Sequence, residues 1–325
     1  MAEILVTVPF AEEERAALLK EAEHFGDRML FVPGKELTGG LLSTAAAVIG
    51  NIAPEMLKEA KELQWLQLNS AGADDYLKKG VLPESVKLTC ATGSYGTTVS
   101  EYMCTMLLVM MKKIPQYLED QKARRWADEG SVSSPAGKRI LIAGTGDIGL
   151  SFERKIRGFS LPDYPITISG VRRRAEQCPA ELDEIHPLTE LAGEVEKADV
   201  IAAALPGTPS TYHVFDAEML KRCKRGAYFM NVGRGSAVDD AALLEPAVWQ
   251  NFSGIWMDVF EKEPLTPDDP LYSVPNLLIT PHIAGKFHLD ITLKRIAALS
   301  LKNYRAWKEN GTFTSEVNRE TGYAE

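Results

Sequence analysis

Residues 138–149 read Lys-Arg-Ile-Leu-Ile-Ala-Gly-Thr-Gly-Asp-Ile-Gly. The apolar run at 140–144 predicts a short strand, and the glycines continue with the spacing G-x-G-x-x-G into a segment, 150–157, that suits a helix. A strand, a tight turn and a helix in this order can hold a pyrophosphate on the unpaired N–H groups of the helix N-terminus. Glycines at this spacing also occur in ordinary turns, so the interpretation depends on the flanking sequence.

A second predicted strand, residues 166–172, leads into three arginines, Arg172, Arg173 and Arg174. A dinucleotide-binding fold usually has an Asp or Glu about 20 residues past the glycines, where it binds the ribose hydroxyls. Guanidinium groups suit a 2′-phosphate instead, because they hold it with bidentate, charge-assisted hydrogen bonds. We therefore expect NADP(H) as the preferred cofactor and NAD(H) as the alternative. A solvated basic turn is the other interpretation of this run.

The bulk properties limit the class of protein. A chain of 325 residues is about twice a typical domain, which predicts two domains. The hydrophobic fraction of 45% and the charged fraction of 25% are those of ordinary soluble proteins. The net charge of -9 disfavours nucleic acid or an anionic membrane surface as a partner.

Cysteine usage and the N-terminus indicate the compartment. The four cysteines show neither C-x-x-C pairing nor a histidine spacing suited to zinc, so we expect free thiols in a reducing compartment and no metal site. The N-terminus carries an acid and starts a strand instead of a basic signal region. No apolar run reaches the length of a membrane span. We expect a cytoplasmic protein.

In the first part of the chain, predicted strands alternate with helices, which indicates a parallel sheet. The strands are expected at 4–8, 45–50, 65–70 and 86–90, and the helices at 12–23 and 54–63. Turns after such strands lie at the carboxyl edge of the sheet, where ligands bind. The backbone N–H groups of Ser70, Ala71 and Gly72 could hold a carboxylate there, although a plain tight turn is an equal alternative.

Residues 98–101, Thr-Val-Ser-Glu, fit a capping box that would start a helix through Met111. This helix is apolar all round, so it must be buried on every face. Burial inside its own domain and burial in a subunit interface are both consistent with the composition. Residues 116–137 are expected to form an exposed connecting arm.

Four later segments are apolar strands that end in polar residues, and an arginine, a glutamate and a histidine follow three of them. Because ligands bind at the carboxyl ends of parallel strands, we expect Arg234, Glu263 and His282 to form one site. Reduction of a 2-oxo acid needs a cation for the carboxylate and carbonyl, and an acid for the oxygen as hydride arrives. Arg234 and His282 suit these roles, and a carboxylate beside the histidine raises its pKa and orients it.

The motifs that carry these residues occur in a fixed order after Gly144. They are Leu205-Pro-Gly-Thr-Pro-Ser-Thr, Asn231-Val-Gly-Arg-Gly, Met257-Asp-Val-Phe-Glu-Lys-Glu-Pro-Leu and Thr280-Pro-His-Ile-Ala-Gly. Together they resemble the D-isomer-specific 2-hydroxyacid dehydrogenase family. The resemblance implies two doubly wound parallel-sheet α/β domains, with a Rossmann nucleotide-binding domain, residues 100–286, inserted into a flavodoxin-like substrate-binding domain, residues 1–99 and 287–325. It also implies a homodimer packed largely through the nucleotide-binding domain.

The same resemblance implies the roles of individual residues. The family's catalytic arginine, glutamate and histidine match Arg234, Glu263 and His282, and its carboxylate-binding loop matches residues 70–72, with Arg234 also binding the substrate. Its cofactor-binding positions match Gly144, Thr145, Gly146, Asp147, Ile148, Gly149, Arg172, Arg173, Arg174, Leu205, Pro206, Thr211, Val232, Gly233, Asp258, His282, Ala284 and Gly285. The version with arginines after the second strand is similar to NADP-using glyoxylate and hydroxypyruvate reductases.

The sequence thus predicts an NADP-dependent reductase of a small 2-oxo acid that yields the D-2-hydroxy acid. A dinucleotide-sensing binding protein on the same fold is the competing hypothesis, and a methyltransferase would leave Arg234, Glu263 and His282 unexplained. Three positions depart from the family pattern. Trp256 stands where a small residue is usual, Pro246 interrupts an expected helix, and Lys286 could touch the substrate or reach solvent. The identity of the 2-oxo acid does not follow from the sequence.

Overall fold

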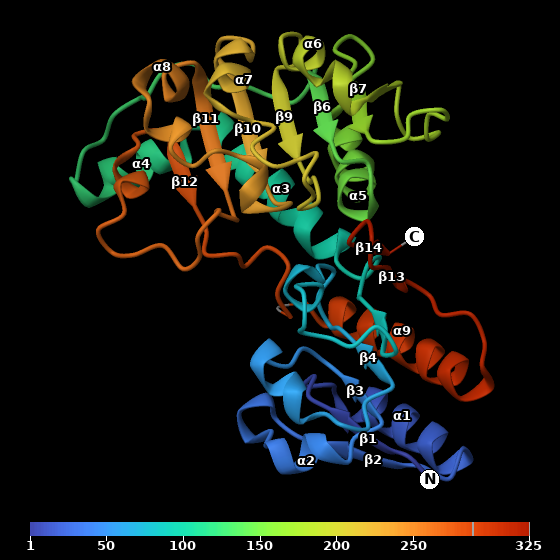
Figure 1. The fold of residues 1–325 in the computed structure, drawn as a ribbon. Coiled ribbons are helices and arrows are strands. Elements are labelled where there is room, and N and C mark those ends of the chain that lie inside the picture. Colours follow the sequence, from blue (N-terminus) through green and yellow to red (C-terminus); the bar gives the residue numbers. More distant parts are fainter. Residues whose placement is uncertain (288, 325) are drawn as a thin grey trace. The chain divides into compact units, whose positions relative to one another are not determined.

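The computed structural model describes residues 1–287 and 289–324, and the chain divides into two compact units. Unit 1 consists of Met1–Tyr95 and Phe287–Glu325, and unit 2 of Gly96–Lys286. Each unit is a parallel sheet with helices packed on it (Figure 1). The expectation of two parallel-sheet α/β domains is confirmed.

Unit 1 contains a five-stranded sheet in the order β2-β1-β3-β4-β5, with every pair parallel. This is the flavodoxin-like order. The strands are β1 (Glu3–Val6), β2 (Arg28–Phe31), β3 (Ala47–Ile49), β4 (Trp65–Gln67) and β5 (Lys87–Thr89). Helix α1 (Glu12–His24) packs against α9 (Asp290–Glu309), and α2 (Gly39–Ser43) packs against the 3-10 helix η2 (Pro54–Glu59). Helix α9, which has 20 residues and is the last helix of the chain, therefore belongs to unit 1.

Two parts of unit 1 differ from the sequence prediction. The helix expected at 54–63 is the short 3-10 helix η2, which ends at Glu59 because Ala60 leaves the helical region, with φ -81° and ψ 70°. Strand β2 and helix α2 were not predicted. Both are short, and α2 starts with two glycines, so it depends on the Thr38 side chain, which accepts a hydrogen bond from the Leu41 N–H (3.4 Å).

Unit 2 contains a seven-stranded parallel sheet in the order β12-β11-β10-β9-β6-β7-β8. The chain starts at β6, winds outward to β8, crosses back to β9 and then winds outward to β12. This is the doubly wound Rossmann order with one further strand, and its switch point lies between β6 and β9. The strands are β6 (Arg139–Ala143), β7 (Thr167–Arg172), β8 (Glu184–Pro187), β9 (Val200–Ala203), β10 (Ala227–Asn231), β11 (Phe252–Met257) and β12 (Leu277–Ile279).

Helices cover the sheet of unit 2. Helix α3 (Gly96–Met111) contacts β10, β11 and α5 (Asp147–Ile156), and it runs behind the strands in Figure 1. The capping box expected at residue 98 is wrong, because α3 already starts at Gly96, whose N–H donates to Asp147 Oδ2 (2.8 Å). A side chain at Gly96 would lie 2.3 Å from Ser151 Oγ, so glycine allows α3 to start directly against α5.

The other helices of unit 2 are short. Helix α7 (Ala217–Arg222) packs against both α6 (Leu191–Val195) and α8 (Pro246–Trp249). Pro246 does not interrupt a helix but begins α8, at the first helical position, where its missing N–H costs nothing. The expected connecting arm begins with α4 (Ile114–Lys122), and only the segment beyond it has no regular secondary structure.

Among the described residues, no helix combines the length and the apolar character needed to cross a membrane. Cys90, Cys104, Cys178 and Cys223 are free thiols. Burial raises the pKa of the Cys223 thiol to about 12, so this group stays protonated in the core.

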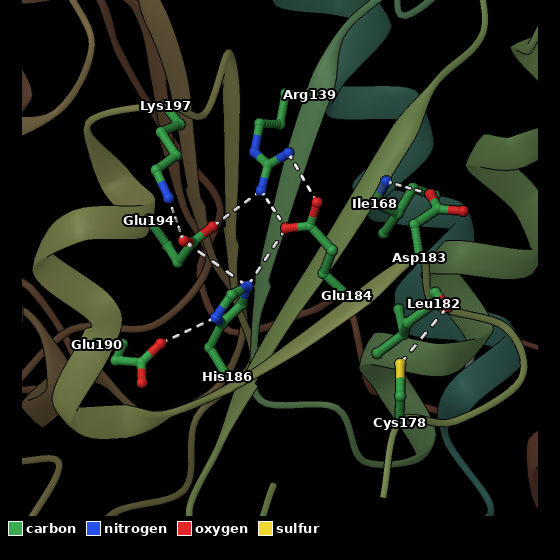
Figure 2. Close-up of polar contacts among 10 residues, drawn as sticks. All are labelled: Arg139, Ile168, Cys178, Leu182, Asp183, Glu184, His186, Glu190, Glu194 and Lys197. Atoms are coloured by element: carbon green, nitrogen blue, oxygen red, sulfur yellow. Dashed lines mark hydrogen bonds and ion pairs between the residues drawn. The ribbon is translucent and has the colours of Figure 1, made fainter.

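An ion-pair network joins the first residue of β6 to β8 and α6. The Arg139 guanidinium lies between Glu184 Oε2 (2.5 Å) and Glu194 Oε2 (3.0 Å), as Figure 2 shows. The His186 ring lies beside the same carboxylates, with Nδ1 3.0 Å from Glu190 Oε2 and Nε2 3.3 Å from Glu184 Oε2. Glu184, His186 and Glu194 have ligand atoms within 4.8 Å of one another, but Arg139 and Lys197 already neutralise these carboxylates, so we assign no metal to the cluster.

This network makes the stability of unit 2 depend on pH. Burial of the His186 ring opposes its protonation, but hydrogen bonds to Glu190 and Glu184 outweigh that effect and raise the pKa of His186. The folded-state pKa therefore lies above the unfolded value of about 6.5. The stabilisation is fully present below that value and is lost as the pH rises through the folded-state pKa.

Replacing His186 with Gln should reveal this charge. We expect His186→Gln to be less stable than the wild type by about 1 kcal/mol at pH 6, since a charged hydrogen bond is lost. The difference should shrink toward pH 9, as the pH rises through the folded-state pKa of His186. Urea unfolding at both pH values measures it, with His24→Gln on the exposed side of α1 as the control. An equal loss at both pH values would mean that the ring acts through packing and not through its charge.

Candidate functional site

The glycine-rich loop after β6 has the shape that a phosphate site needs. Gly144 has φ +103°, and a Cβ there would lie 2.5 Å from the Ala204 carbonyl oxygen, so only glycine fits this turn. A Cβ at Gly149 would lie 2.2 Å from the Gly144 oxygen, which brings α5 close to the strand. A Cβ at Gly146 would meet nothing within 4 Å. The loop is therefore tight on the protein side and open at Gly146, directly before the first turn of α5.

Two further observations fit a bound dinucleotide at this loop. Thr145 Oγ1 is buried and has no hydrogen-bond partner within the chain. Arg172 is the last residue of β7, the next strand, where its Nη2 donates to the Gln177 oxygen (2.6 Å) and its buried Nε has no partner. Arg173 and Arg174 follow and are exposed. The residues present thus fit a dinucleotide with an extra phosphate at the end of β7.

The loops after β9 and β10 lie against each other. A Cβ at Gly233 would lie 2.3 Å from the Leu205 oxygen, so these two backbones touch. Thr211 Oγ1 closes the first loop, where it donates to the Pro206 oxygen (2.5 Å) and accepts from the Thr208 N–H (2.9 Å). Val232 and Leu205 are buried. The predicted cofactor positions in these two loops therefore lie packed together at the carboxyl edge, beside the glycine-rich loop.

Arg234 is held at the end of β10 by a side-chain amide. Asn231 Oδ1 accepts from the Gly233 N–H (3.1 Å), and Asn231 Nδ2 donates to the Arg234 oxygen (3.0 Å). The Arg234 Nη1 donates to the Gly233 oxygen (3.0 Å), and the residue is half-buried. The buried amide of Asn231 therefore fixes the turn from which the guanidinium extends.

The structure brings Glu263 and His282 into direct contact. His282 Nδ1 lies 2.7 Å from Glu263 Oε2, and Glu263 Oε1 accepts from the Phe260 N–H (2.9 Å). Both side chains remain accessible, with relative exposures of 53% for the histidine and 34% for the glutamate. Glu263 follows β11, and the neighbouring strands β10 and β12 lead to Arg234 and His282. The three predicted catalytic residues thus follow three adjacent strands.

Asp258 holds the loop that carries His282. The residue is 2% exposed, and its Oδ1 and Oδ2 accept from the N–H groups of Ile283 and Ala284, both at 3.1 Å. The Asp258 carbonyl oxygen accepts from the His282 N–H (2.8 Å), and His282 has φ +50°, which a residue other than glycine rarely adopts. The predicted contact of Asp258 with the cofactor stays a prediction, and in the structure its carboxylate oxygens accept from backbone N–H groups of the histidine loop.

Asp240, an acidic residue that contacts the turn 260–263, is not among the residues predicted from the sequence. Asp240 Oδ2 accepts from the Glu261 N–H (2.9 Å), and burial raises the pKa of Asp240 to about 6. Glu261 Oε1 in turn lies 2.8 Å from the Tyr212 hydroxyl and 3.1 Å from His213 Nε2. The turn 260–263 is therefore held by Asp240 on one side and by Glu263 on the other. The paired aspartates after β10 were the only sequence signal for this contact.

The predicted carboxylate loop lies at the carboxyl edge of the unit 1 sheet, after β4. Asn51, after the adjacent β3, exchanges two hydrogen bonds with Asn69, from its N–H to Asn69 Oδ1 (2.5 Å) and from the Asn69 N–H to its Oδ1 (3.0 Å). Ser70 Oγ donates to the Gly72 oxygen (2.7 Å). These bonds tie down the start of the loop and leave the N–H groups of Ala71 and Gly72 outside them.

Comparisons with known proteins match this architecture. A family model described as the NAD-binding domain of D-isomer-specific 2-hydroxyacid dehydrogenases matches residues 104–284. Glyoxylate/hydroxypyruvate reductase B of Pectobacterium carotovorum is 30% identical over 257 residues, which cover 76% of this chain and 78% of that protein. Glyoxylate reductase of Korarchaeum cryptofilum is 28% identical over 275 residues, which cover 83% of this chain and 80% of that protein.

Two solved structures have the same fold over the full chain. A D-isomer-specific 2-hydroxyacid dehydrogenase family protein from Aeromonas salmonicida aligns with a TM-score of 0.84 at 30% identity, covering 98% of this chain and 99% of that one. The NADPH-dependent glyoxylate/hydroxypyruvate reductase of Sinorhizobium meliloti, solved with NADP and sulfate, aligns with a TM-score of 0.81. It is 23% identical and covers 99% of this chain and 100% of that one, which shows the fold alone.

Two alanine substitutions in the glycine-rich loop should have different effects, one on stability and the other on dinucleotide binding. Gly149→Ala should lower the free energy of unfolding by about 1–3 kcal/mol, because its Cβ would overlap the Gly144 oxygen. Gly146→Ala should leave stability unchanged, because its Cβ meets open space, but should weaken dinucleotide binding about tenfold, or roughly 1.4 kcal/mol. Thermal unfolding and fluorescence titration measure both. Unchanged affinity in a stable Gly146→Ala protein would place the phosphates elsewhere.

Proposed function

Because the chain belongs to the D-isomer-specific 2-hydroxyacid dehydrogenase family, it is an oxidoreductase, and we propose that it reduces a small 2-oxo acid with NADPH. The proposed substrates are of the glyoxylate or hydroxypyruvate type, and the product is the D-2-hydroxy acid. The contact between His282 Nδ1 and Glu263 Oε2, at 2.7 Å, carries this proposal. A carboxylate that contacts Nδ1 fixes the orientation of the ring and leaves Nε2 available to the substrate oxygen.

The cofactor is proposed to bind at the carboxyl edge of the unit 2 sheet. Its pyrophosphate would rest on the open backbone at Gly146 and the first turn of α5, within reach of Thr145 Oγ1. The arginines after β7 would hold the 2′-phosphate of NADP(H), which distinguishes it from NAD(H). Bound there, the reduced nicotinamide supplies the hydride.

The chain's own groups perform the remaining chemistry. Arg234 binds the substrate carboxylate and polarises the carbonyl, since a guanidinium offers two parallel N–H groups to such oxygens. The carbonyl carbon gains the hydride while its oxygen takes the proton from His282 Nε2. Glu263 orients the ring through Nδ1 and stabilises its charge until that proton is transferred. We further propose that the loop 70–72 binds the substrate carboxylate through the N–H groups of Ala71 and Gly72.

We also propose that the protein is a homodimer through unit 2. Helix α3 buries only one stripe of its surface within the chain, and half-buried apolar side chains such as Met106, Leu108 and Val109 lie outside that stripe. The following segment exposes large apolar side chains, namely Ile114, Leu118, Trp126 and Val132. Exposed apolar side chains that gather on one surface are typical of an interface, and we propose that these residues contribute to it. The cytoplasmic location expected from the sequence stays a prediction.

Turnover of 2-oxo acids tests the proposed function. We expect the wild type to oxidise NADPH with glyoxylate or hydroxypyruvate, followed by the nicotinamide absorbance. His282→Asn should lower kcat by about 10²–10⁴-fold, because the proton donor is lost, while the Kd for NADPH stays unchanged. His24→Asn in unit 1 is the control.

Two outcomes would contradict the proposal. Tight NADPH binding without turnover of any acid in a panel that includes branched and aromatic ones would favour a dinucleotide-sensing protein. Unchanged kcat in His282→Asn would remove this residue as the acid.

Cofactor preference tests the arginines separately. Arg173→Ala should raise KM for NADPH about tenfold or more and leave KM for NADH nearly unchanged, because only NADPH carries the phosphate. Arg225→Ala removes the same charge from the residues just before β10, at the opposite edge of the same sheet, and serves as the control. Equal effects of Arg173→Ala on both cofactors would place the 2′-phosphate site elsewhere.

A further inference from the structure

A chain of hydrogen bonds connects a buried tryptophan to the loop that carries His282. Trp256 lies in β11 and is fully buried, and its Nε1–H donates to Thr280 Oγ1 (2.9 Å) at the end of the adjacent β12. The Thr280 hydroxyl donates to Asp258 Oδ1 (2.5 Å). The same Asp258 oxygen accepts from the Ile283 N–H (3.1 Å). Three side chains thus form one path from the core of unit 2 to the backbone beside the histidine.

The direction of each hydrogen bond in this path is determined by chemistry. An indole N–H can only donate, so the Thr280 oxygen must accept from it. The Thr280 proton is then directed at the Asp258 carboxylate, which can only accept when ionised. With an apolar residue at position 256, this hydroxyl would be free to rotate toward another acceptor. Trp256 therefore fixes the orientation of a donor that the buried carboxylate needs.

We propose that Trp256 and Thr280 are positioning residues that act through Asp258 to hold His282 in its active geometry. The inference rests on the proposed function for the role of His282. Asp258 fixes the backbone on both sides of the catalytic side chain, because its carbonyl oxygen binds the His282 N–H and its carboxylate binds the next two N–H groups. A loosened carboxylate would release a residue whose φ of +50° is unfavourable without such support.

Unit 1 contains the same arrangement, which supplies a matched control. Trp65 in β4 donates from Nε1 to Thr89 Oγ1 (2.9 Å) in the adjacent β5, and Thr89 Oγ1 donates to Gln67 Oε1 (2.8 Å). In both units the acceptor stands two residues after the tryptophan. In unit 1 it is a neutral amide that binds the Asn303 side chain (2.7 Å), whereas in unit 2 it is a carboxylate that binds the histidine loop. Trp65→Phe removes the same bond without touching residues 282–284.

The first measurement is hydrogen exchange of the N–H groups of residues 282–284 in the protein without cofactor. We expect about tenfold faster exchange in Trp256→Phe and in Thr280→Val, since a tenfold change corresponds to roughly 1.4 kcal/mol of lost local stability. Thr280→Ser keeps the hydroxyl and should exchange as the wild type does. Trp65→Phe should leave exchange at 282–284 unchanged.

The second measurement is steady-state kinetics of the same variants. We expect kcat to fall about tenfold in Trp256→Phe and in Thr280→Val, with KM for NADPH unchanged, because only the histidine loop is affected. The kcat of the double variant, which combines Trp256→Phe with Thr280→Val, should be no lower than that of Thr280→Val alone, since Trp256 acts through the threonine. Thr280→Ser should restore kcat.

These measurements separate the inference from the proposed function. If the wild type reduces no 2-oxo acid, the proposed function fails, and the exchange data still test whether Trp256 holds the loop. Equal acceleration at 282–284 by Trp65→Phe and Trp256→Phe would overturn the inference, because the effect would be a general loosening. Additive losses in the double variant would overturn it as well, and so would failure of Thr280→Ser to restore the loop.

Discussion

A buried carboxylate needs a hydrogen bond to nearly every lone pair that it withdraws from water, and in unit 2 this requirement organises the proposed catalytic edge. Asp258 is almost fully buried, and backbone N–H groups of the loop after β12 meet its two oxygens. The loop therefore has one arrangement in which the carboxylate is satisfied. That arrangement gives His282 its unusual backbone angle and brings its ring against Glu263.

Parallel sheet order brings the remaining parts of the site together. The glycine-rich loop and the loop after β9 flank the switch point, where crossovers leave in opposite directions. Gly144 and Gly233 let the backbones of neighbouring strand ends touch, and Gly149 lets α5 pack closely against the loop after β6. The chain has a net charge of -9, and in the proposed site the arginines at the end of β7 would provide the local positive charge that an anionic cofactor needs.

The two edges of the unit 2 sheet use charge differently. At the start of the strands, ion pairs neutralise one another, as Arg139 does with Glu184 and Glu194, and Lys224 with Asp199. Such pairs join strands and leave no charge for a ligand. At the carboxyl edge, Glu263 and His282 form a pair that is still accessible to solvent. The ion pairs at the starts of the strands thus contribute to stability, while the carboxyl edge keeps an ionisable pair that solvent can reach.

The sequence by itself determined the parallel α/β class and the glycine-rich turn, and it predicted one site for the three residues Arg234, Glu263 and His282. These follow from local spacing, since a strand and the residues after it are read from consecutive positions. The short strands β2 and β8 escaped prediction, and η2 is shorter than the helix expected at 54–63, because few local contacts define such short elements. Only the tertiary structure decided that Asp258 binds the histidine loop and that Trp256 reaches Thr280. Those bonds join side chains on different strands, and strand register, which depends on packing of the whole sheet, determines which of them meet.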